Sequence, residues 1–170
     1  ARQRCWQFDW VIDLDIKGFF DNIEHELLMR AVRKHAKDPW VVLYIGRWLT
    51  APAQDEEGWV TERGKGTPQG GVISPLLANL FLHYAFDVWM RSKYPQTPFE
   101  RYADDAIVHC RTEAEAQKVR AAIAVRMEEW RLELHPAKTK VVVCKGGNKR
   151  RSYPNAKFGF LGYGCPARKG

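Results

Sequence analysis

The chain has 170 residues, of which 45% are hydrophobic and 28% charged, and its formal net charge is +7. These proportions are those of a globular domain, so collagen, coiled coil and intrinsic disorder are excluded. The longest apolar stretch, residues 76–86, contains Asn79 and His83 and is shorter than the roughly 18 residues that a membrane span needs.

The first predicted element is a strand over residues 10–16, in which apolar side chains recur at every second position. Its other face carries Asp13 and Asp15, which is unusual for a strand whose first face is so apolar. Gly18 is expected to close the strand. Two carboxylates on one strand face make this segment the first candidate for a functional site.

Two helices are expected next. Asn22 is a suitable cap for a helix that begins near Ile23. Asp38, followed by Pro, is a typical start for another helix, which is predicted to run to about Leu49. Residues 53–62 are interpreted as a small hairpin.

A Gly-rich loop over residues 64–71 leads into a long helix that is predicted to begin at Ser74. Two short strands, over residues 99–102 and 106–110, are predicted to follow. Residues 103–105 form the tight turn between them.

A third amphipathic helix is predicted over residues 113–132 and a fourth strand over residues 141–144. A basic loop, residues 145–151, precedes a last aromatic strand over residues 157–163. Read in order, these elements form a split β-α-β-β-α-β unit. We therefore predict an α+β fold with a ferredoxin-like antiparallel sheet and helices packed on one face.

In such a sheet the first strand lies beside the third, so Asp15 is predicted to face Asp104 and Asp105. Carboxylates that lie close together raise one another's pKa unless a cation sits between them, and Mg²⁺ prefers oxygen ligands. Two such ions can stabilise the attacking and leaving oxygens of a phosphoryl displacement. A lone Asp-Asp pair is more often a polar turn, but Tyr-Ala-Asp-Asp between two apolar strands is more specific.

Five segments resemble, in order, motifs of the reverse transcriptase family. Residues 102–105 (YADD) resemble its catalytic box, residues 15–23 its first catalytic motif and residues 66–75 its second. Residues 134–140 resemble its lysine-bearing motif, and residues 158–163 resemble the hairpin that grips the primer. The amino-acid sequences of the five motifs are most similar to those of bacterial group II intron reverse transcriptases, also called maturases. The resemblance covers nearly the whole chain.

The resemblance implies a polymerase palm with a C-terminal primer-grip hairpin. We expect residues 1–170 to form one domain, with the catalytic palm over about residues 1–145 and a basic loop and primer-grip strand over residues 146–170. The family carries fingers motifs before this region and a thumb after it. We interpret the chain as an excised palm with partial fingers, so robust polymerisation by it alone is not expected.

The resemblance also implies roles for single residues. Asp15, Asp104 and Asp105 would be catalytic and, with the carbonyl of Ile16, would hold two Mg²⁺ ions, for which Mn²⁺ can substitute. Phe20 would lie under the sugar of the incoming nucleotide and exclude a 2′-hydroxyl. Core packing is the alternative role for this ring.

Further residues would line the nucleotide site: Lys17, Gly18, Phe19, Gln69, Gly70 and Lys138. The primer and template would be contacted by Tyr102, Pro68, Phe160, Leu161 and Gly162. Lys138 would donate a proton to pyrophosphate, although a solvated surface lysine fits the sequence equally well. Alternatively, the loop around Gly70 only connects to the next helix. That interpretation does not explain its glycines.

The implied partners are an RNA template, a DNA primer, deoxynucleoside triphosphates and a group II intron RNA, with no membrane. Four basic residues near the predicted primer grip offer charge that can follow a nucleic-acid backbone: Lys145, Lys149, Arg150 and Arg151. The four cysteines never form a C-x-x-C pair, which argues against zinc. The start of the chain lacks a signal peptide, so a bacterial cytoplasmic location is expected.

The predicted function is that of an RNA-directed DNA polymerase core, which in a full protein would serve retrohoming with maturase-assisted splicing. One alternative is a reverse transcriptase of another bacterial class, either CRISPR-associated or diversity-generating. Another is a non-catalytic RNA-binding module of the same strand and helix order. That module is disfavoured because four aspartates on its central strands would repel phosphate.

Overall fold

A four-stranded antiparallel sheet forms the centre of the chain. The computed structural model describes residues 4, 7–52, 63–68 and 70–144, and the backbone of residues 53–54, 60–61, 157–160 and 163–166. The sheet contains β1 (Trp10–Leu14), β4 (Phe99–Tyr102), β5 (Asp105–Cys110) and β6 (Lys140–Val143). Its order is β4-β5-β1-β6, so the first strand lies beside the third, as predicted.

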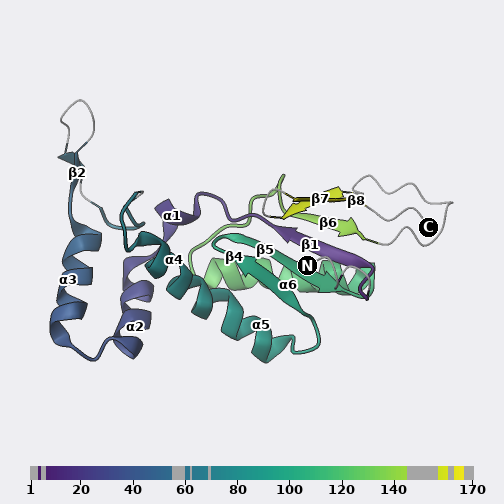
Figure 1. Cartoon of the computed structure of the whole chain (residues 1–170), viewed down its shortest axis with the longest axis horizontal. Coiled ribbons are helices and arrows are strands. Elements are labelled where there is room, and N and C mark those ends of the chain that lie inside the picture. Colours follow the sequence, from purple (N-terminus) through teal and green to yellow (C-terminus); the bar gives the residue numbers. More distant parts are fainter. Residues whose placement is uncertain are drawn as a thin grey trace.

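Helices and two short hairpins surround this sheet. The helices are α1 (Phe19–Asn22), α2 (His25–His35), α3 (Pro39–Thr50), α4 (Ser74–Leu82), α5 (Val88–Lys93) and α6 (Glu113–Glu129), and a π-helical turn, η2 (His83–Asp87), joins α4 to α5. The hairpins are β2 (Ala53–Gln54) with β3 (Val60–Thr61), and β7 (Lys157–Phe160) with β8 (Tyr163–Pro166). Figure 1 shows α4, α5 and α6 on one side of the sheet and β7–β8 on the other. The α+β prediction is confirmed.

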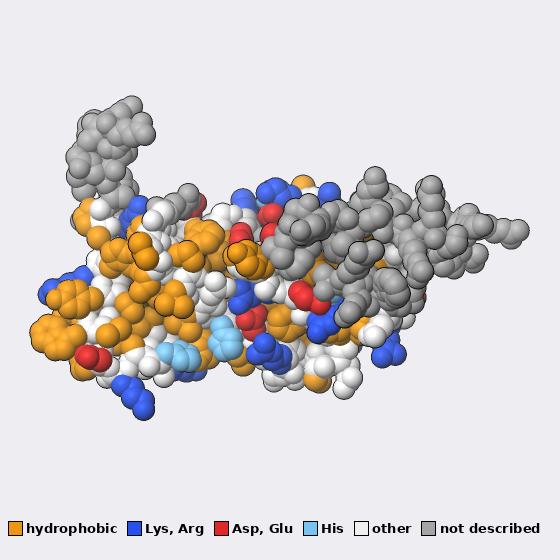
Figure 2. All heavy atoms as spheres, viewed as in Figure 1, with side chains coloured by type: hydrophobic (Ala, Val, Ile, Leu, Met, Phe, Trp, Pro, Cys, Tyr) orange, Lys and Arg blue, Asp and Glu red, His pale blue; other side chains and the backbone are white. Residues whose placement is uncertain are grey.

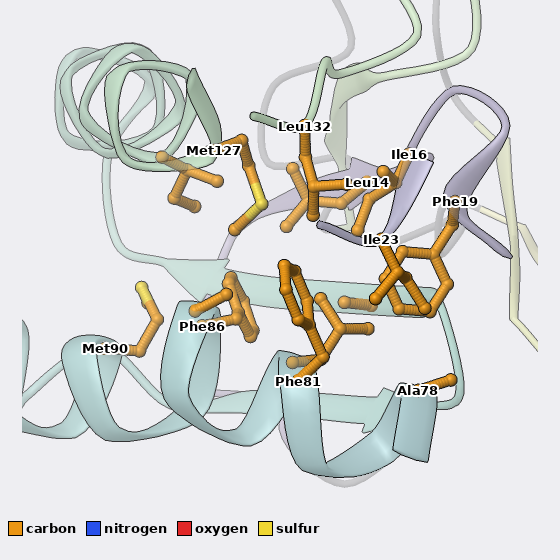
Figure 3. Close-up of a cluster of buried hydrophobic side chains, with 14 of the residues drawn as sticks. Leu14, Ile16, Phe19, Ile23, Ala78, Phe81, Phe86, Met90, Met127 and Leu132 are labelled. Atoms are coloured by element: carbon orange, nitrogen blue, oxygen red, sulfur yellow. The ribbon is translucent and has the colours of Figure 1, made fainter. Parts of the chain in front are cut away.

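The main hydrophobic core lies between the sheet and these helices. Ile12 and Leu14 of β1 alternate with residues of the opposite face and pack toward the helices. Figure 3 shows Phe81 and Phe86 pointing from the α4–α5 segment toward β1 and the end of α6. Phe81 also makes an edge-on contact with Trp130, with ring centroids 5.2 Å apart. One face of β1 is therefore fixed by packing, which leaves its other face for the aspartates.

Two helix starts follow the local rules that the sequence suggests. Asp38 accepts a hydrogen bond from the backbone N–H of Trp40 at 2.9 Å, and Pro39 opens α3. Thr112 accepts one from the N–H of Glu115 at 3.1 Å and caps α6. In both places a side chain satisfies a backbone donor that the helix leaves free.

The start of α2 differs from the prediction. Asn22 does not cap this helix, which begins at His25. Its side-chain amide donates instead to the carbonyl oxygens of Gly18 at 2.9 Å and Lys17 at 3.2 Å, so it stabilises the turn before α2. The side chain binds this turn because Gly18 adopts a left-handed conformation (φ 54°) and brings those carbonyls within reach.

Several other boundaries also differ. The first strand ends at Leu14, and Ile16 forms only an isolated bridge with Leu134. The helix predicted over residues 113–132 ends at Glu129, because Arg131 has a positive φ (57°) and leaves the helical region. The long helix from Ser74 is interrupted by the π turn η2, and the last strand, predicted over residues 157–163, is the hairpin β7–β8.

The helix α3 lies far from the sheet and is mostly exposed, although its Leu49 belongs to the main core (Figure 1). Of its residues only Leu49 is buried, whereas Trp40 and Tyr44 are about two-thirds exposed (66% and 62%). Figure 2 shows hydrophobic side chains gathered over this end of the molecule.

In the described part of the chain, no helix has both the length and the hydropathy of a membrane span.

Candidate catalytic site

The pairing of β1 with β5 brings two acidic segments to one edge of the sheet. In this antiparallel pair Leu14 lies opposite Ala106, so Asp15 continues from β1 toward the turn that joins β4 to β5. That turn holds Asp104, and Asp105 is the first residue of β5. Strand pairing thus places carboxylates from distant parts of the sequence near one another.

The carboxylates at this edge interact electrostatically with one another. Burial raises the pKa of Asp105, and the charges of Asp104 and Asp15 raise it further. Burial, Asp105 and Asp15 together raise the pKa of Asp13 to about 6, while Lys140 acts in the opposite direction. Mutual repulsion of this kind is relieved when a cation binds between the carboxylates. The edge therefore has the charge pattern of a cation site.

The donor chemistry fits a hard divalent cation. Asp15, Asp104 and Asp105 supply carboxylate oxygens. The carbonyl of Ile16 takes no part in the bridge to Leu134, whose hydrogen bonds are made by the residues on either side. Across the described ranges, no three His, Cys, Asp or Glu side chains already lie at metal-cluster spacing. The donors have the chemistry that such a cation needs, and the assignment of these four residues stays a prediction.

The backbone of Asp15 is held by the lysine-bearing segment. The hydroxyl of Thr139 accepts a hydrogen bond from the N–H of Asp15 at 3.3 Å and donates one to its carbonyl oxygen at 3.2 Å. The N–H of His135 donates to the same carbonyl at 2.8 Å. These hydrogen bonds involve only the backbone of Asp15. They fix the position of the residue and leave its carboxylate able to make other contacts.

Lys138 lies on the same segment and forms an ion pair with Asp15. Its ammonium nitrogen is 3.4 Å from a carboxylate oxygen, and the lysine side chain is 63% exposed. A cation that bound Asp15 would compete with this ammonium group. The structure therefore places Lys138 at the acidic edge, and its role toward pyrophosphate remains a prediction.

Arg101 anchors the turn that carries Asp104. Its guanidinium makes two hydrogen bonds to the carboxylate of Asp87, at 2.8 and 2.7 Å, and one to the carbonyl of Ala103 at 2.7 Å. Ala103 has a positive φ (53°), which a residue with a side chain adopts only when its surroundings hold it there. The arginine thus ties a strained turn to η2.

Sequence reasoning missed both members of this pair. The side chains of Asp87 and Arg101 are only 11% and 10% exposed, and His83 lies 3.6 Å from the same carboxylate. The available signal was an aspartate within the apolar stripe of a predicted helix, directly before Val88. A buried acid requires a partner, and the arginine beside the acidic turn was a candidate.

The first motif and the Gly-rich loop pack against one another. Thr67 donates its backbone N–H to the carbonyl of Phe20 at 2.8 Å, and Gly66 donates to that of Ile23 at 2.7 Å. A Cβ atom at Gly66 would lie 2.9 Å from the carbonyl oxygens of Phe20 and Asp21, so the close approach requires glycine. The predicted nucleotide-binding segments are therefore neighbours.

Within these segments the individual candidates lie in different environments. Phe19 is buried in the core, whereas Phe20 is half-buried, with its ring 5.3 Å from that of Phe19. Lys17 is exposed and lies 3.2 Å from Glu133. Gly70 has a positive φ (82°) and open space around it. A ring that packs on the core on one side can still border a nucleotide, so both roles proposed for Phe20 remain.

The primer and template candidates are only partly described. Tyr102 is 66% exposed at the end of β4, opposite Asp105. Pro68 is half-buried and accepts a hydrogen bond from the hydroxyl of Ser74. Phe160 belongs to β7, of which only the backbone is described. The remaining candidates lie outside the described residues: Gln69, Leu161, Gly162 and the basic residues of segment 145–151.

Comparisons with known proteins agree with this geometry. A family model for reverse transcriptase (RNA-dependent DNA polymerase) matches residues 2–165. Protein YkfC of Escherichia coli (strain K12) is 29% identical over 187 residues, which cover 91% of this chain and 46% of YkfC. The group II intron-encoded protein LtrA of Lactococcus lactis subsp. cremoris is 38% identical over 95 residues, which cover 54% of this chain and 16% of LtrA. The chain thus spans less than half the length of either relative.

A solved structure shares the fold. Apo telomerase from Candida tropicalis, truncated from its C-terminal domain, superposes with a TM-score of 0.73 over 98% of this chain and 36% of the telomerase chain. The sequence identity is 14%. The likeness therefore concerns the arrangement of strands and helices.

Proposed function

The chain belongs to the reverse transcriptase (RNA-dependent DNA polymerase) family, and on this basis we propose that it is the catalytic core of an RNA-directed DNA polymerase. It would add deoxynucleotides to the 3′-hydroxyl of a primer. We interpret it as a palm with partial fingers, in which about residues 1–145 are catalytic and residues 146–170 form the basic loop and primer grip.

One observation carries the proposal. The register of β1 and β5 directs Asp15 toward the turn that holds Asp104 and Asp105. Burial raises the pKa of Asp105, and the charges of Asp104 and Asp15 add to this effect. Phosphoryl transfer needs no covalent protein nucleophile, because positioning and charge stabilisation supply most of the rate enhancement. Carboxylates that hold metal ions at this place would supply the charge stabilisation that the reaction needs.

Members of the family generally use divalent metal ions. We infer that Asp15, Asp104 and Asp105, with the carbonyl of Ile16, would hold two Mg²⁺ ions, for which Mn²⁺ can substitute. When bound, such ions offset negative charge on the attacking and leaving oxygens. The chain's own contribution is to fix the donors, through Thr139 at Asp15 and through Arg101 at the acidic turn.

The incoming nucleotide would lie against residues 17–20 and the Gly-rich loop. Contacts between Thr67 and Phe20 hold these two segments together. Phe20 would exclude a ribose 2′-hydroxyl, while Gly70 would allow the backbone to approach the ligand. Lys138 would give a proton to departing pyrophosphate.

An RNA template and a DNA primer would lie near Tyr102 and Pro68, with Phe160, Leu161 and Gly162 at the primer. The group II intron-encoded relative LtrA supports assignment to the group II intron type. In a longer protein this core would then serve retrohoming and maturase-assisted splicing of its intron RNA. A CRISPR-associated or diversity-generating reverse transcriptase is the second candidate.

The proposal is tested by single-nucleotide primer extension under enzyme excess, on matched RNA and DNA templates with Mg²⁺. Addition of one nucleotide does not require the robust polymerisation that this core alone is not expected to perform, so we expect RNA-templated addition by the wild-type chain. The rate should fall by at least about a hundredfold in Asp104→Asn, since removal of one electrostatic contact to the reacting centre typically costs that much. Binding of Mn²⁺, followed by electron paramagnetic resonance, should weaken in the same variant.

The matched control is Glu128→Gln, which removes one negative charge from an exposed position on α6. It should extend primers and bind Mn²⁺ as the wild type does. Tight RNA binding by wild type and Asp104→Asn alike, with neither extension nor Mn²⁺ binding in the wild type, would contradict the catalytic proposal and favour a non-catalytic RNA-binding module.

A further inference from the structure

A hollow lies on the helical side of the molecule, and none of the acidic-edge residues lines it. It has a volume of about 360 Å³ and is formed by α2, α5 and the end of α6. Leu27, Ala31 and Val88 contribute apolar surface to its lining. Pockets that bind small organic ligands begin at roughly this size, ~300 Å³. The hollow can therefore hold one ring system with a polar attachment.

The walls of the hollow are aromatic. Tyr84, Trp89 and Trp130 all line it. The ring of Trp89 makes an edge-on contact with Tyr94, with centroids 5.4 Å apart, which fixes its orientation. Rings held in this way can stack a flat ligand without first losing conformational freedom.

The rim is basic and, in the described part of the chain, no acidic residue lines it. Arg30, Lys34 and Lys93 are exposed there and form no ion pair with any described residue. Arg126 differs, because it already bonds the carbonyls of Ala85 and Tyr84 and pairs with Glu129 at 2.7 Å. The unpaired cations, rather than Arg126, are therefore available to an anion.

Of these three rings, Trp89 alone has no described cation over its face. The guanidinium of Arg126 lies over Trp130 at 5.1 Å from the ring centroid, and Phe81 contacts the same indole. The ammonium of Lys34 lies over Tyr84 at 4.6 Å. Trp89 is left, and we assign the stacking contact to it.

We propose that this hollow binds one nucleotide unit of single-stranded RNA, with the base on Trp89 and the phosphate at Lys34 and Lys93. Aromatic stacking combined with backbone-directed cations is the general chemistry of single-stranded nucleic-acid binding. The choice of RNA rests on the proposed function, whereas the site is separate, because no residue of the acidic edge lines the hollow. It would hold a strand away from the polymerase centre.

The test is photocrosslinking of a six-nucleotide oligouridylate that contains 4-thiouridine to the full chain, in EDTA so that metal binding plays no part. We expect a crosslinked peptide that includes Trp89. Uridine monophosphate, added as a competitor, distinguishes a free nucleotide from an RNA strand. The strand should bind at least about tenfold more tightly, because additional phosphates meet the basic rim.

Variants make the assignment specific. Lys34→Glu with Lys93→Glu should weaken binding of a fluorescein-labelled oligouridylate by about tenfold or more, and Trp89→Ala by about tenfold. Lys118→Glu with Arg120→Glu is the matched control, since both residues are exposed on α6 outside the hollow. Asp104→Asn should crosslink at Trp89 as the wild type does, even though it loses polymerase activity.

Other results would overturn the inference. Crosslinks confined to the acidic edge, or equal losses in the pocket and control charge reversals, would show that RNA binds elsewhere or through net charge alone. Wild-type affinity in Trp89→Ala would exclude the stacking role. Binding of an acidic peptide in place of the oligouridylate would assign the hollow to a protein partner.

Discussion

At the scale of single residues, the geometry of the acidic edge depends on groups that carry no charge. Thr139 is 6% exposed and makes hydrogen bonds to both the N–H and the carbonyl of Asp15. Its hydroxyl therefore holds the backbone of Asp15, the first residue after β1 ends at Leu14. This makes Thr139 a positioning residue, which acts through Asp15.

Replacement of Thr139 by valine tests this role. The substitution keeps the shape but removes the hydroxyl, so we expect Mn²⁺ affinity to fall by about tenfold and the free energy of unfolding by about 1–2 kcal/mol. Thr139→Ser should restore Mn²⁺ affinity, because it keeps the hydroxyl. An equal loss of Mn²⁺ affinity in the serine and valine variants would contradict the positioning role.

At the scale of secondary-structure elements, the acidic turn depends on a helix that lies behind it. The π turn η2 places Asp87 where its carboxylate receives two hydrogen bonds from Arg101, and the same guanidinium holds the carbonyl of Ala103. Single π turns are rare and occur frequently at functional sites. The helix thus sets the conformation of the β4–β5 turn.

A double-mutant cycle measures this coupling. Asp87→Asn and Arg101→Gln should each lower the free energy of unfolding by about 3 kcal/mol, since each leaves one buried charge without its partner. The double variant should lose much less than the sum, which urea unfolding would reveal. Additive losses would mean that the two side chains do not act as a pair.

At the scale of the whole molecule, the two cysteines whose side chains are described, Cys110 and Cys144, lie at different parts of the sheet. Cys110 lies in β5, between two other strands, and is fully buried. Cys144 is also buried but directly follows β6, which is an edge strand. Burial, together with the nearby charge of Glu115, raises the pKa of Cys110 to about 12. Its thiol therefore stays protonated in the folded protein at neutral pH.

Alkylation with iodoacetamide at pH 8, followed by peptide mass mapping, should modify Cys144 before Cys110. Cys110 should react only when the chain unfolds globally. Because its folded pKa exceeds the ordinary value, the contribution of Cys110 to stability is complete below about pH 9 and declines as the pH rises toward 12. Rapid modification of Cys110 under native conditions would contradict its placement in the sheet centre.

The order and type of the main elements follow from local sequence signals. Periodicity identified β1 and α6, and the Asp38 cap located the start of α3, because these signals depend on neighbours within one or two turns. Strand order followed from the unit they form, so the approach of Asp15 to the acidic turn could be predicted from residues alone. The candidate carboxylates were found in this way.

The way in which those carboxylates are held depends on contacts between distant segments. The hydrogen bonds of Thr139 to Asp15 and of Arg101 to Asp87 join residues that no local pattern relates. The position of Asn22 depended on the left-handed turn at Gly18, and the hollow around Trp89 needed three helices to pack together. Local preferences fix each element, but contacts between elements are set by packing of the whole chain, because their free energy comes from buried surface that no single segment possesses.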